Sequence, residues 1–87
     1  MSAKVVMYST RFCPYCMRAR RLLSSKGVEF EDIDVGADAA LWKTMASLSG
    51  RDTVPQIFIN DQSVGGFDDI AHLDRLGKLD PLLESKQ

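Results

Sequence analysis

Cys13-Pro14-Tyr15-Cys16 follows a short apolar run at residues 5–8 and precedes a helical pattern of apolar positions. Two cysteines separated by two residues at a strand-to-helix junction are typical of a thiol–disulfide redox centre. At the start of a helix, positions i and i+3 can form a disulfide with little movement of the backbone. The sulfur of Cys13 would also lie beside unpaired N–H groups of the first helical turn, whose partial positive charge favours the nucleophilic thiolate.

Two other roles for the cysteines are less consistent with the sequence. A structural disulfide across four residues would remove little unfolded-state entropy, about 2 kcal/mol, and small stapled domains normally carry several such bridges. A structural zinc site usually needs four Cys or His ligands, whereas the chain has two cysteines and a single histidine, His72. We therefore predict a redox-active dithiol and no metal site.

The length and composition predict one small globular domain. The chain has 87 residues, 45% of them hydrophobic, and we expect residues 1–87 to form a single domain. No apolar run approaches the roughly 20 residues of a membrane span, and the N-terminal residues lack the apolar core of a secretory signal. The net charge of −1 argues against nucleic-acid or membrane partners. We expect a cytoplasmic monomer, because a paired thiol is a working redox couple in the cytosol.

The charges are unevenly distributed along the chain. Residues 1–28 hold six basic side chains and no acidic one, and all twelve acidic residues lie from Glu29 onward. The cysteines lie in this basic segment, and nearby cations stabilise a thiolate. We expect Arg11 and Arg18 to supply that charge, and Arg20 and Arg21 to lie on a solvated helix face.

Periodicity and turn signals predict an α/β fold. The expected elements are a strand over 4–9, a helix from Pro14 to Lys26, a strand over 28–35, a helix over 39–49, strands over 55–59 and 62–66, and a helix over 67–76. Pro55 should mark the start of its strand, because proline has no N–H to donate. Asp80-Pro81 is expected to start a further short helix, as cap and first helical residue. The order β-α-β-α-β-β-α corresponds to a four-stranded mixed sheet flanked by helices. Its first two strands should be parallel. Cys13 then follows the carboxyl end of the first strand, where sites form in such sheets.

Three motifs together resemble the dithiol glutaredoxins of the Cys-Pro-Tyr-Cys type. They are the cysteine motif after a strand, Thr53-Val54-Pro55 before the third strand, and Gly65-Gly66-x-Asp68-Asp69 at the start of the following helix. The resemblance covers essentially the whole chain. It implies a thioredoxin-like fold and glutathione-dependent thiol–disulfide exchange, with glutathione as co-substrate and disulfide-bonded or glutathionylated proteins as partners.

The same resemblance implies roles for individual residues. Cys13 would be the nucleophile, Cys16 the resolving thiol, and Pro55 a cis-proline that faces them. The Val54 backbone would pair with the cysteinyl part of glutathione, and the turn at 66–69 would hold its γ-glutamyl end. The implied glutathione site comprises Arg11, Tyr15, Thr53, Val54, Pro55, Gly66, Phe67, Asp68 and Asp69.

The chain departs from the family pattern at two positions. Many relatives carry a lysine where this chain has Thr10, so the cation for the glycyl carboxylate would be Arg11. Many also have a small residue or a cysteine at the position of Phe67, and this chain therefore lacks a third thiol there. For glutathione, a flexible ligand with two carboxylates and one ammonium, backbone N–H groups at a helix start, a cation and an acid form a suitable site.

Two alternative functions stay open at the level of sequence. One is an electron donor that thioredoxin reductase reduces, of the type that serves ribonucleotide reductase. The other is an iron–sulfur cluster carrier in which Cys13 and glutathione ligate the cluster in a dimer. The acidic pair after Gly66, together with Tyr15, favours glutathione over the first alternative, and Cys16 argues against the second because such carriers typically lack a resolving cysteine.

Overall fold

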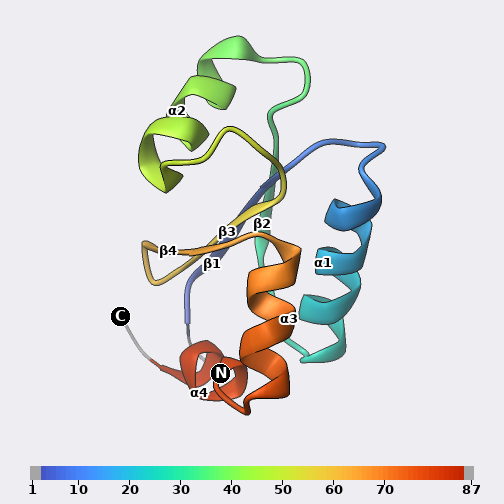
Figure 1. The fold of residues 1–87 in the computed structure, drawn as a ribbon, viewed down its shortest axis with the longest axis vertical. Coiled ribbons are helices and arrows are strands. Elements are labelled where there is room, and N and C mark those ends of the chain that lie inside the picture. The colour runs from blue at the N-terminus through green and yellow to red at the C-terminus, as the bar shows by residue number, and fades with distance from the viewer. Residues whose placement is uncertain (1–2, 86–87) are drawn as a thin grey trace.

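The computed structural model describes residues 3–85. In chain order, its elements are β1 (Val5–Ser9), α1 (Pro14–Ser25), β2 (Glu31–Asp34), α2 (Ala39–Ser49), β3 (Gln56–Ile59), β4 (Gln62–Gly65), α3 (Phe67–Arg75) and α4 (Leu79–Glu84). The strands form one sheet in the order β2-β1-β3-β4 (Figure 1). The β1 strand pairs in parallel with β2 and antiparallel with β3, which pairs antiparallel with β4. The predicted four-stranded mixed sheet is confirmed.

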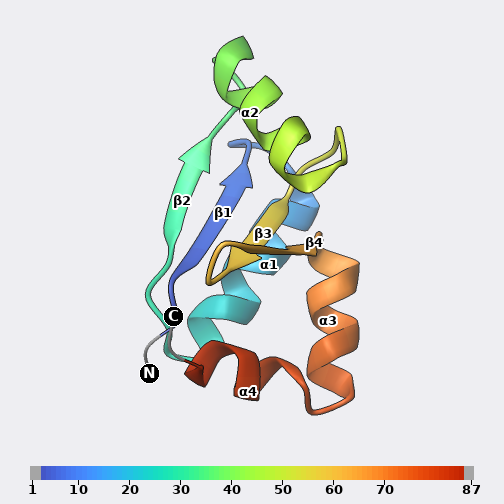
Figure 2. The same ribbon diagram turned by 90° about the vertical axis from the view of Figure 1, so that its left-hand side faces the viewer.

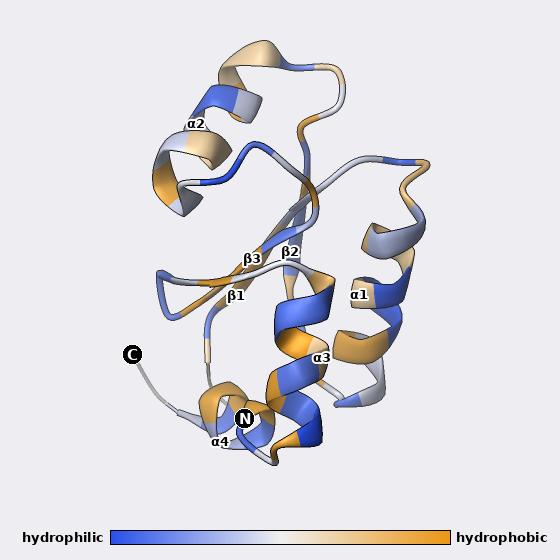
Figure 3. Cartoon of the chain, in the orientation of Figure 1, coloured by the Kyte–Doolittle hydropathy of each residue, from blue (hydrophilic) through white to orange (hydrophobic). Residues whose placement is uncertain are grey.

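Alternate residues of the central strands enter two separate cores. Val5 and Met7 of β1 pack with apolar residues of α1, α3 and α4, whereas Tyr8 packs on the opposite face with Met45 of α2. Figure 2 shows the sheet between these helices, and in Figure 3 the hydrophobic colour is concentrated along β3. Because helices cover both faces, the central strands can be apolar throughout, as in parallel α/β sheets. The sheet thus holds the carboxyl end of β1, and the loop that follows it, in a fixed position.

Helix α1 begins and ends where the sequence predicts. Pro14 is its first residue, and the buried side chains of Cys16, Ala19 and Leu23 face the core. Lys26 caps the carboxyl end, and its ammonium lies 2.5 Å from Asp74 and 3.0 Å from Asp80. The end of α1 is therefore tied to both carboxyl-terminal helices.

The hairpin of β3 and β4 follows from the chemistry of its turn. Asn60 and Asp61 both have positive φ, 52° and 65°, as a two-residue type I′ turn requires. The β3 strand begins at Gln56, directly after Pro55, because proline has no N–H to donate to a strand ladder.

Two predicted boundaries are wrong. The strand expected over 28–35 is confined to Glu31–Asp34, because its pairing with β1 runs only from Val6–Glu31 to Ser9–Asp34, and residues 28 and 29 lie beyond the start of β1. The last helix begins at Leu79 with Lys78 as its cap, so Asp80 is not the cap and Pro81 is the third helical residue. Proline is tolerated there because first-turn N–H groups have no intrahelical partner. None of the helices within residues 3–85 is long and apolar enough to cross a membrane.

Candidate active site

Cys13 lies at the amino-terminal cap of α1, directly after the loop that leaves β1. Its backbone is extended, and its Sγ accepts a hydrogen bond from the Cys16 N–H at 3.3 Å. The thiol in turn faces the carbonyl oxygen of Val54, 3.9 Å away. Both cysteines are free thiols, and Cys13 is half-buried. The sulfur of Cys13 is therefore held by the first turn of α1 on one side and by the chain before β3 on the other.

Cys16 differs from Cys13 in its burial. Its side chain is fully buried against the sheet, with 0% of its surface exposed. Burial, and to a lesser degree the hydrogen bond with Cys13, raises the pKa of the Cys16 thiol to about 11. Since the thiolate is the reactive form, Cys16 is a neutral and protected thiol at physiological pH.

The expectation that Arg20 lies on a solvated helix face is wrong. Its Nε donates to Asp32 of β2 at 2.6 Å, and its Nη2 donates to the Ser9 hydroxyl at 2.9 Å and the Thr10 carbonyl at 3.1 Å. Arg20 thus joins α1 to β1, to β2 and to the start of the cysteine loop. Arg21, by contrast, is exposed as predicted.

The Val54–Pro55 peptide bond is cis, as predicted. The Val54 carbonyl that faces Cys13 belongs to this bond. The Thr53 hydroxyl accepts a hydrogen bond from the side-chain Nε2 of Gln56 at 3.2 Å, which closes a short polar turn around Pro55. The bend over 52–54 is further held from α2, because the Trp42 indole N–H donates to Asp52.

Two adjacent glycines bring the start of α3 close to Pro55. Gly65 has φ +102°, and a Cβ there would collide with the Asp69 carboxylate. A Cβ on Gly66 would lie 3.1 Å from the Pro55 carbonyl oxygen, tighter than an ordinary contact. Gly66 therefore allows the close approach to Pro55, and Gly65 leaves room for the Asp69 carboxylate.

Asp69 is committed to contacts within the protein. Its Oδ2 accepts the Gly66 N–H at 2.9 Å, which caps α3, and it pairs with Arg51 Nη1 at 2.7 Å. The hydrogen bond from Arg51 lowers the pKa of Asp69, and the Gly66 N–H lowers it further. Asp68, one residue earlier, is exposed, and its carboxylate has no ion pair within residues 3–85.

A cavity of about 190 Å³ lies between these segments. Its lining consists of Tyr15, Arg51, Thr53, Val54, Pro55, Gln56, Gly66, Phe67, Asp68 and Asp69. Eight of the nine residues expected to bind glutathione are therefore brought together. The ninth, Arg11, lines a different depression with Thr10 and Asp34, and its guanidinium lies 6.0 Å from the Phe12 ring centre.

Sequence reasoning did not identify two of the lining residues. Arg51 is the only cation in the lining, and its one available signal was its place two residues before the Thr53 motif. Gln56 is 1% exposed, and its carbonyl oxygen has no hydrogen-bond partner within residues 3–85. Its position after Pro55 in an apolar strand gave no sign that its amide would face the cavity.

Comparisons with known proteins agree with this geometry. The family model "Glutaredoxin" matches residues 5–64. Glutaredoxin 3 of Escherichia coli (strain K12) is 52% identical over 82 residues, which cover 94% of this chain and 99% of that protein. The solution structure of glutaredoxin from Brucella melitensis has a TM-score of 0.83 at 49% identity, over 93% of this chain and 88% of that one.

A structure with a ligand is also similar. The crystal structure of the buckwheat glutaredoxin–glutathione complex has a TM-score of 0.86 at 30% identity and covers 93% of this chain and 76% of that chain. These matches confirm the thioredoxin-like fold expected from the three sequence motifs. With the family model covering most of the chain and half-identical relatives matching nearly all of it, the chain belongs to the glutaredoxin family.

Proposed function

We propose that this glutaredoxin is a glutathione-dependent thiol–disulfide oxidoreductase. The observation that carries the proposal is the placement of one accessible and one buried thiol beside a cavity of glutathione-binding character. Cys13 is half-buried and held near the Val54 carbonyl, whereas Cys16 is fully buried with its pKa raised to about 11. This asymmetry supports attack by Cys13 and resolution by Cys16.

The proposed reaction with a glutathionylated protein uses one cysteine. The Cys13 thiolate attacks the glutathione sulfur of the mixed disulfide, and the protein thiolate leaves and takes up a proton. Glutathione is then bound to Cys13 through a disulfide. A second glutathione thiolate attacks the sulfur of that bound glutathione, which releases glutathione disulfide and regenerates the Cys13 thiolate.

A protein disulfide requires both cysteines. Cys13 attacks one sulfur and forms a mixed disulfide with the protein, whose other sulfur leaves as a thiol. Cys16 then loses its proton and attacks Cys13, which releases the second protein thiol and forms the Cys13–Cys16 disulfide. Two glutathione molecules reduce this disulfide in turn and become glutathione disulfide. The backbone contact of 3.3 Å between Cys16 and Cys13 Sγ brings the two residues close enough for this exchange.

The cavity supports the glutathione part of the proposal. The first-turn N–H groups of α3 and the exposed Asp68 offer partners to the carboxylate and the ammonium of the γ-glutamyl end. The backbone of Val54, before β3, is available to the cysteinyl part, as in the pairing of an extended peptide with a strand edge. Either Arg51, in the cavity, or Arg11, outside it, would bind the glycyl carboxylate. The buckwheat relative is known as a complex with glutathione, which is consistent with this assignment.

The remaining properties follow from this function. We propose that residues 1–87 act as one glutaredoxin domain, monomeric and cytoplasmic, where glutathione keeps thiols reduced. Its macromolecular partners would be proteins that carry disulfides or bound glutathione. Neither nucleic acid nor membrane is proposed as a partner, and no metal is assigned to the site.

A coupled assay tests the proposal and separates the alternatives. The mixed disulfide of glutathione and 2-mercaptoethanol is the substrate, with reduced glutathione, glutathione reductase and NADPH in one arm. Thioredoxin reductase and NADPH replace the glutathione system in the second arm. We expect turnover only in the first arm. Turnover only in the second would establish the thioredoxin-reductase-dependent donor, and a brown protein with a glutathione-dependent cluster after anaerobic purification would establish the cluster carrier.

A further inference from the structure

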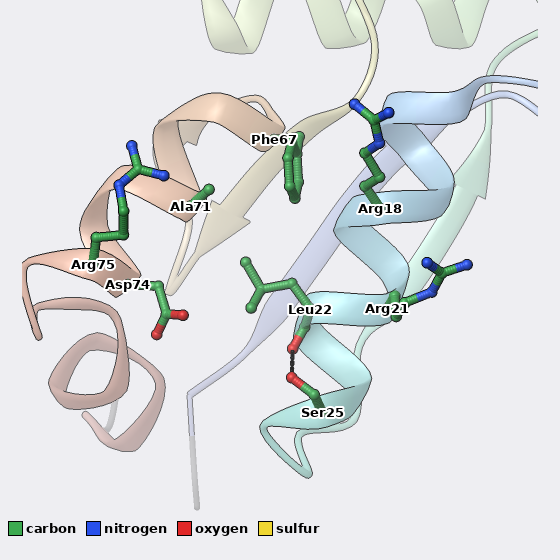
Figure 4. Close-up of a pocket in the computed structure, with 8 residues that line it drawn as sticks. All are labelled: Arg18, Arg21, Leu22, Ser25, Phe67, Ala71, Asp74 and Arg75. Carbon is green, nitrogen blue, oxygen red and sulfur yellow. Dashed lines mark hydrogen bonds between the residues drawn. The ribbon is translucent and has the colours of Figure 1, made fainter.

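A second hollow lies between α1 and α3, separate from the cavity beside Cys13. Its volume is about 420 Å³. Figure 4 shows the residues that line it: Arg18, Arg21, Leu22 and Ser25 from α1, and Phe67, Ala71, Asp74 and Arg75 from α3. We refer to this hollow as the α1–α3 groove. Its floor is apolar, and arginines stand on both helices that border it.

The groove carries unbalanced positive charge. Arg18, Arg21 and Arg75 are exposed and form no ion pair within residues 3–85. The one acidic residue of the lining, Asp74, lies 2.5 Å from the Lys26 ammonium, so its charge is already matched. Figure 4 shows the Arg18 guanidinium at one end of the groove, that of Arg21 on the side of α1 turned away from α3, and that of Arg75 on the opposite flank. Three exposed guanidinium groups therefore border the groove without a counter-ion from the described chain.

The groove is continuous with the candidate active site. Phe67 lines both the groove and the cavity beside Cys13. The Arg18 guanidinium lies 5.2 Å from the centre of the Tyr15 ring, and Tyr15 belongs to the same cavity. A polypeptide whose disulfide reached Cys13 could thus continue past Tyr15 and Phe67 directly into the groove.

We propose that the α1–α3 groove docks an acidic segment of the protein substrate, with an aliphatic side chain against Leu22 and Phe67. This inference rests on the proposed function, because it concerns the substrate that presents a disulfide to Cys13. Arginine is well suited to the role, since its planar guanidinium binds carboxylates through paired hydrogen bonds. A charged rim of this kind accelerates encounter and selects partners more than it adds affinity.

The geometry of α1 sets the spacing of that segment. With a rise of about 1.5 Å per residue, Arg18 and Arg21 lie about 6 and 10 Å along the helix from its start beside Cys13. An extended peptide covers about 3.3 Å per residue. The acidic residues should therefore lie about two to four positions from the reacting cysteine.

Three properties favour an acidic peptide over other occupants. The groove shares only Phe67 with the cavity beside Cys13, so glutathione bound in that cavity would leave the groove unfilled. Its charge is confined to three arginines on a chain of net charge −1, which makes an extended polyanion a poor match. The apolar residues of its lining are Leu22, Phe67 and Ala71 alone, which suits one aliphatic side chain rather than an extended apolar surface.

Synthetic peptides test the proposal. Each peptide carries one glutathionylated cysteine and, two to four positions away on either side, Asp-Leu-Asp or the uncharged Asn-Leu-Asn. We expect the protein to react with the acidic peptides several-fold faster, as kcat/KM, and expect this preference to shrink between 0.05 M and 0.5 M salt. Arg21→Gln and Arg75→Gln should each reduce the preference about twofold, and the double variant about fourfold, because the two arginines share no partner.

The controls separate this proposal from the proposed function. Lys43→Gln removes an exposed cation on α2, away from the groove, and should keep the full preference. All variants should reduce the glutathione–mercaptoethanol disulfide at the unaltered rate, which also shows that they fold. Equal rates on acidic and uncharged peptides, or an equal loss in Lys43→Gln, would overturn the docking proposal while leaving the redox activity intact. A concentration-dependent dimer that Arg21→Gln abolishes would also overturn it, because a second copy would then occupy the groove.

Discussion

Arg51 and Asp69 form an ion pair across the cavity beside Cys13, with Nη1 2.7 Å from Oδ2. The same carboxylate oxygen caps α3 by accepting the Gly66 N–H at 2.9 Å. One carboxylate therefore joins the segment before β3 to the start of α3. This pair keeps the opening of the cavity in place, and it leaves Asp68 as the carboxylate free to meet a ligand.

This ion pair predicts a stability difference at acidic pH. Arg51 and the Gly66 N–H hold the pKa of Asp69 below its usual value of 3.8. A carboxyl group with a lowered pKa stabilises the fold above its unfolded pKa, and that contribution is lost as pH falls through the folded value. Between pH 5 and pH 2.5 the free energy of unfolding of the unsubstituted protein should therefore fall more than that of the Asp69→Asn variant. Urea unfolding at each pH measures this, and parallel curves for the two proteins would contradict it.

The raised pKa of Cys16 predicts how fast the second cysteine resolves a mixed disulfide. The pKa of Cys16 is about 11, so below pH 11 its thiolate fraction increases tenfold for each unit by which the pH rises. In protein carrying glutathione on Cys13, the release of glutathione by Cys16 should accelerate about tenfold per pH unit from pH 6 to 9. Stopped-flow kinetics or quenched mass spectrometry follow this release. A rate that reached its plateau below pH 8 would show that Cys16 is ionised far more easily than its burial allows.

The same burial predicts an effect on stability at alkaline pH. The folded pKa of Cys16, about 11, lies above its usual value of 9.0. A thiol with a raised pKa stabilises the fold fully below its unfolded pKa, and that stabilisation is lost as pH rises through the folded value. Between pH 9 and 11 the protein should therefore lose more stability than Cys16→Ala, as thermal unfolding under reducing conditions would show. Equal losses would mean that Cys16 does not titrate in this range.

Single substitutions of the cysteines should separate the two reactions. Deglutathionylation requires only one attacking sulfur, so Cys16→Ser should retain this activity while Cys13→Ser abolishes it. Reduction of a protein disulfide should need both thiols, because the mixed disulfide has to be resolved. Turnover of the glutathione–mercaptoethanol disulfide and of an insulin-type disulfide measures the two reactions in parallel. If Cys16→Ser lost both activities equally, the one-cysteine route would be wrong.

Local chemistry made most of the fold predictable from the sequence. Pro14 and Gly27 bound α1, and the Asn60-Asp61 pair specifies a tight hairpin, because each residue type favours the backbone angles found there. The residue at which β2 begins was not predictable in this way. The length of this strand depends on where β1 offers hydrogen-bond partners, and that is a property of the pairing rather than of residues 28–30.

Some residues of the candidate site were predictable from the sequence, and others were not. Cys13 and Cys16 were predictable because both lie in one four-residue motif whose spacing sets their geometry. Arg20 and Arg51 were not, since their partners Asp32 and Asp69 lie 12 and 18 residues away and meet them only through the fold. The partner of a long arginine side chain depends on the tertiary structure, whereas the geometry of a four-residue motif is set by its local backbone.

The position of Arg51 predicts which cation binds the glycyl carboxylate. Arg51 lines the cavity beside Cys13, whereas Arg11 lies outside it near Phe12. We expect Arg51→Gln to raise the KM for the glutathione–mercaptoethanol disulfide several-fold, and Arg11→Gln to change it less. Steady-state kinetics at saturating glutathione reductase test this ranking. Asp69→Asn serves as control for the lost ion pair, because it removes that pair while keeping the cation, and a larger effect of Arg11→Gln would reverse the assignment.

The last prediction concerns the ammonium of the γ-glutamyl end. Asp69 already accepts hydrogen bonds from Arg51 and Gly66, so its charge is matched, whereas the exposed Asp68 lines the cavity with no ion pair in the described chain. A partly exposed ion pair contributes up to about 1 kcal/mol, which corresponds to about fivefold in affinity. Asp68→Asn should therefore raise KM for glutathione mixed disulfides several-fold with little change in unfolding temperature. Asp69→Asn should instead lower the unfolding temperature, because it weakens the cap of α3. An unchanged KM in Asp68→Asn would place the γ-glutamyl end elsewhere and favour the donor that thioredoxin reductase reduces.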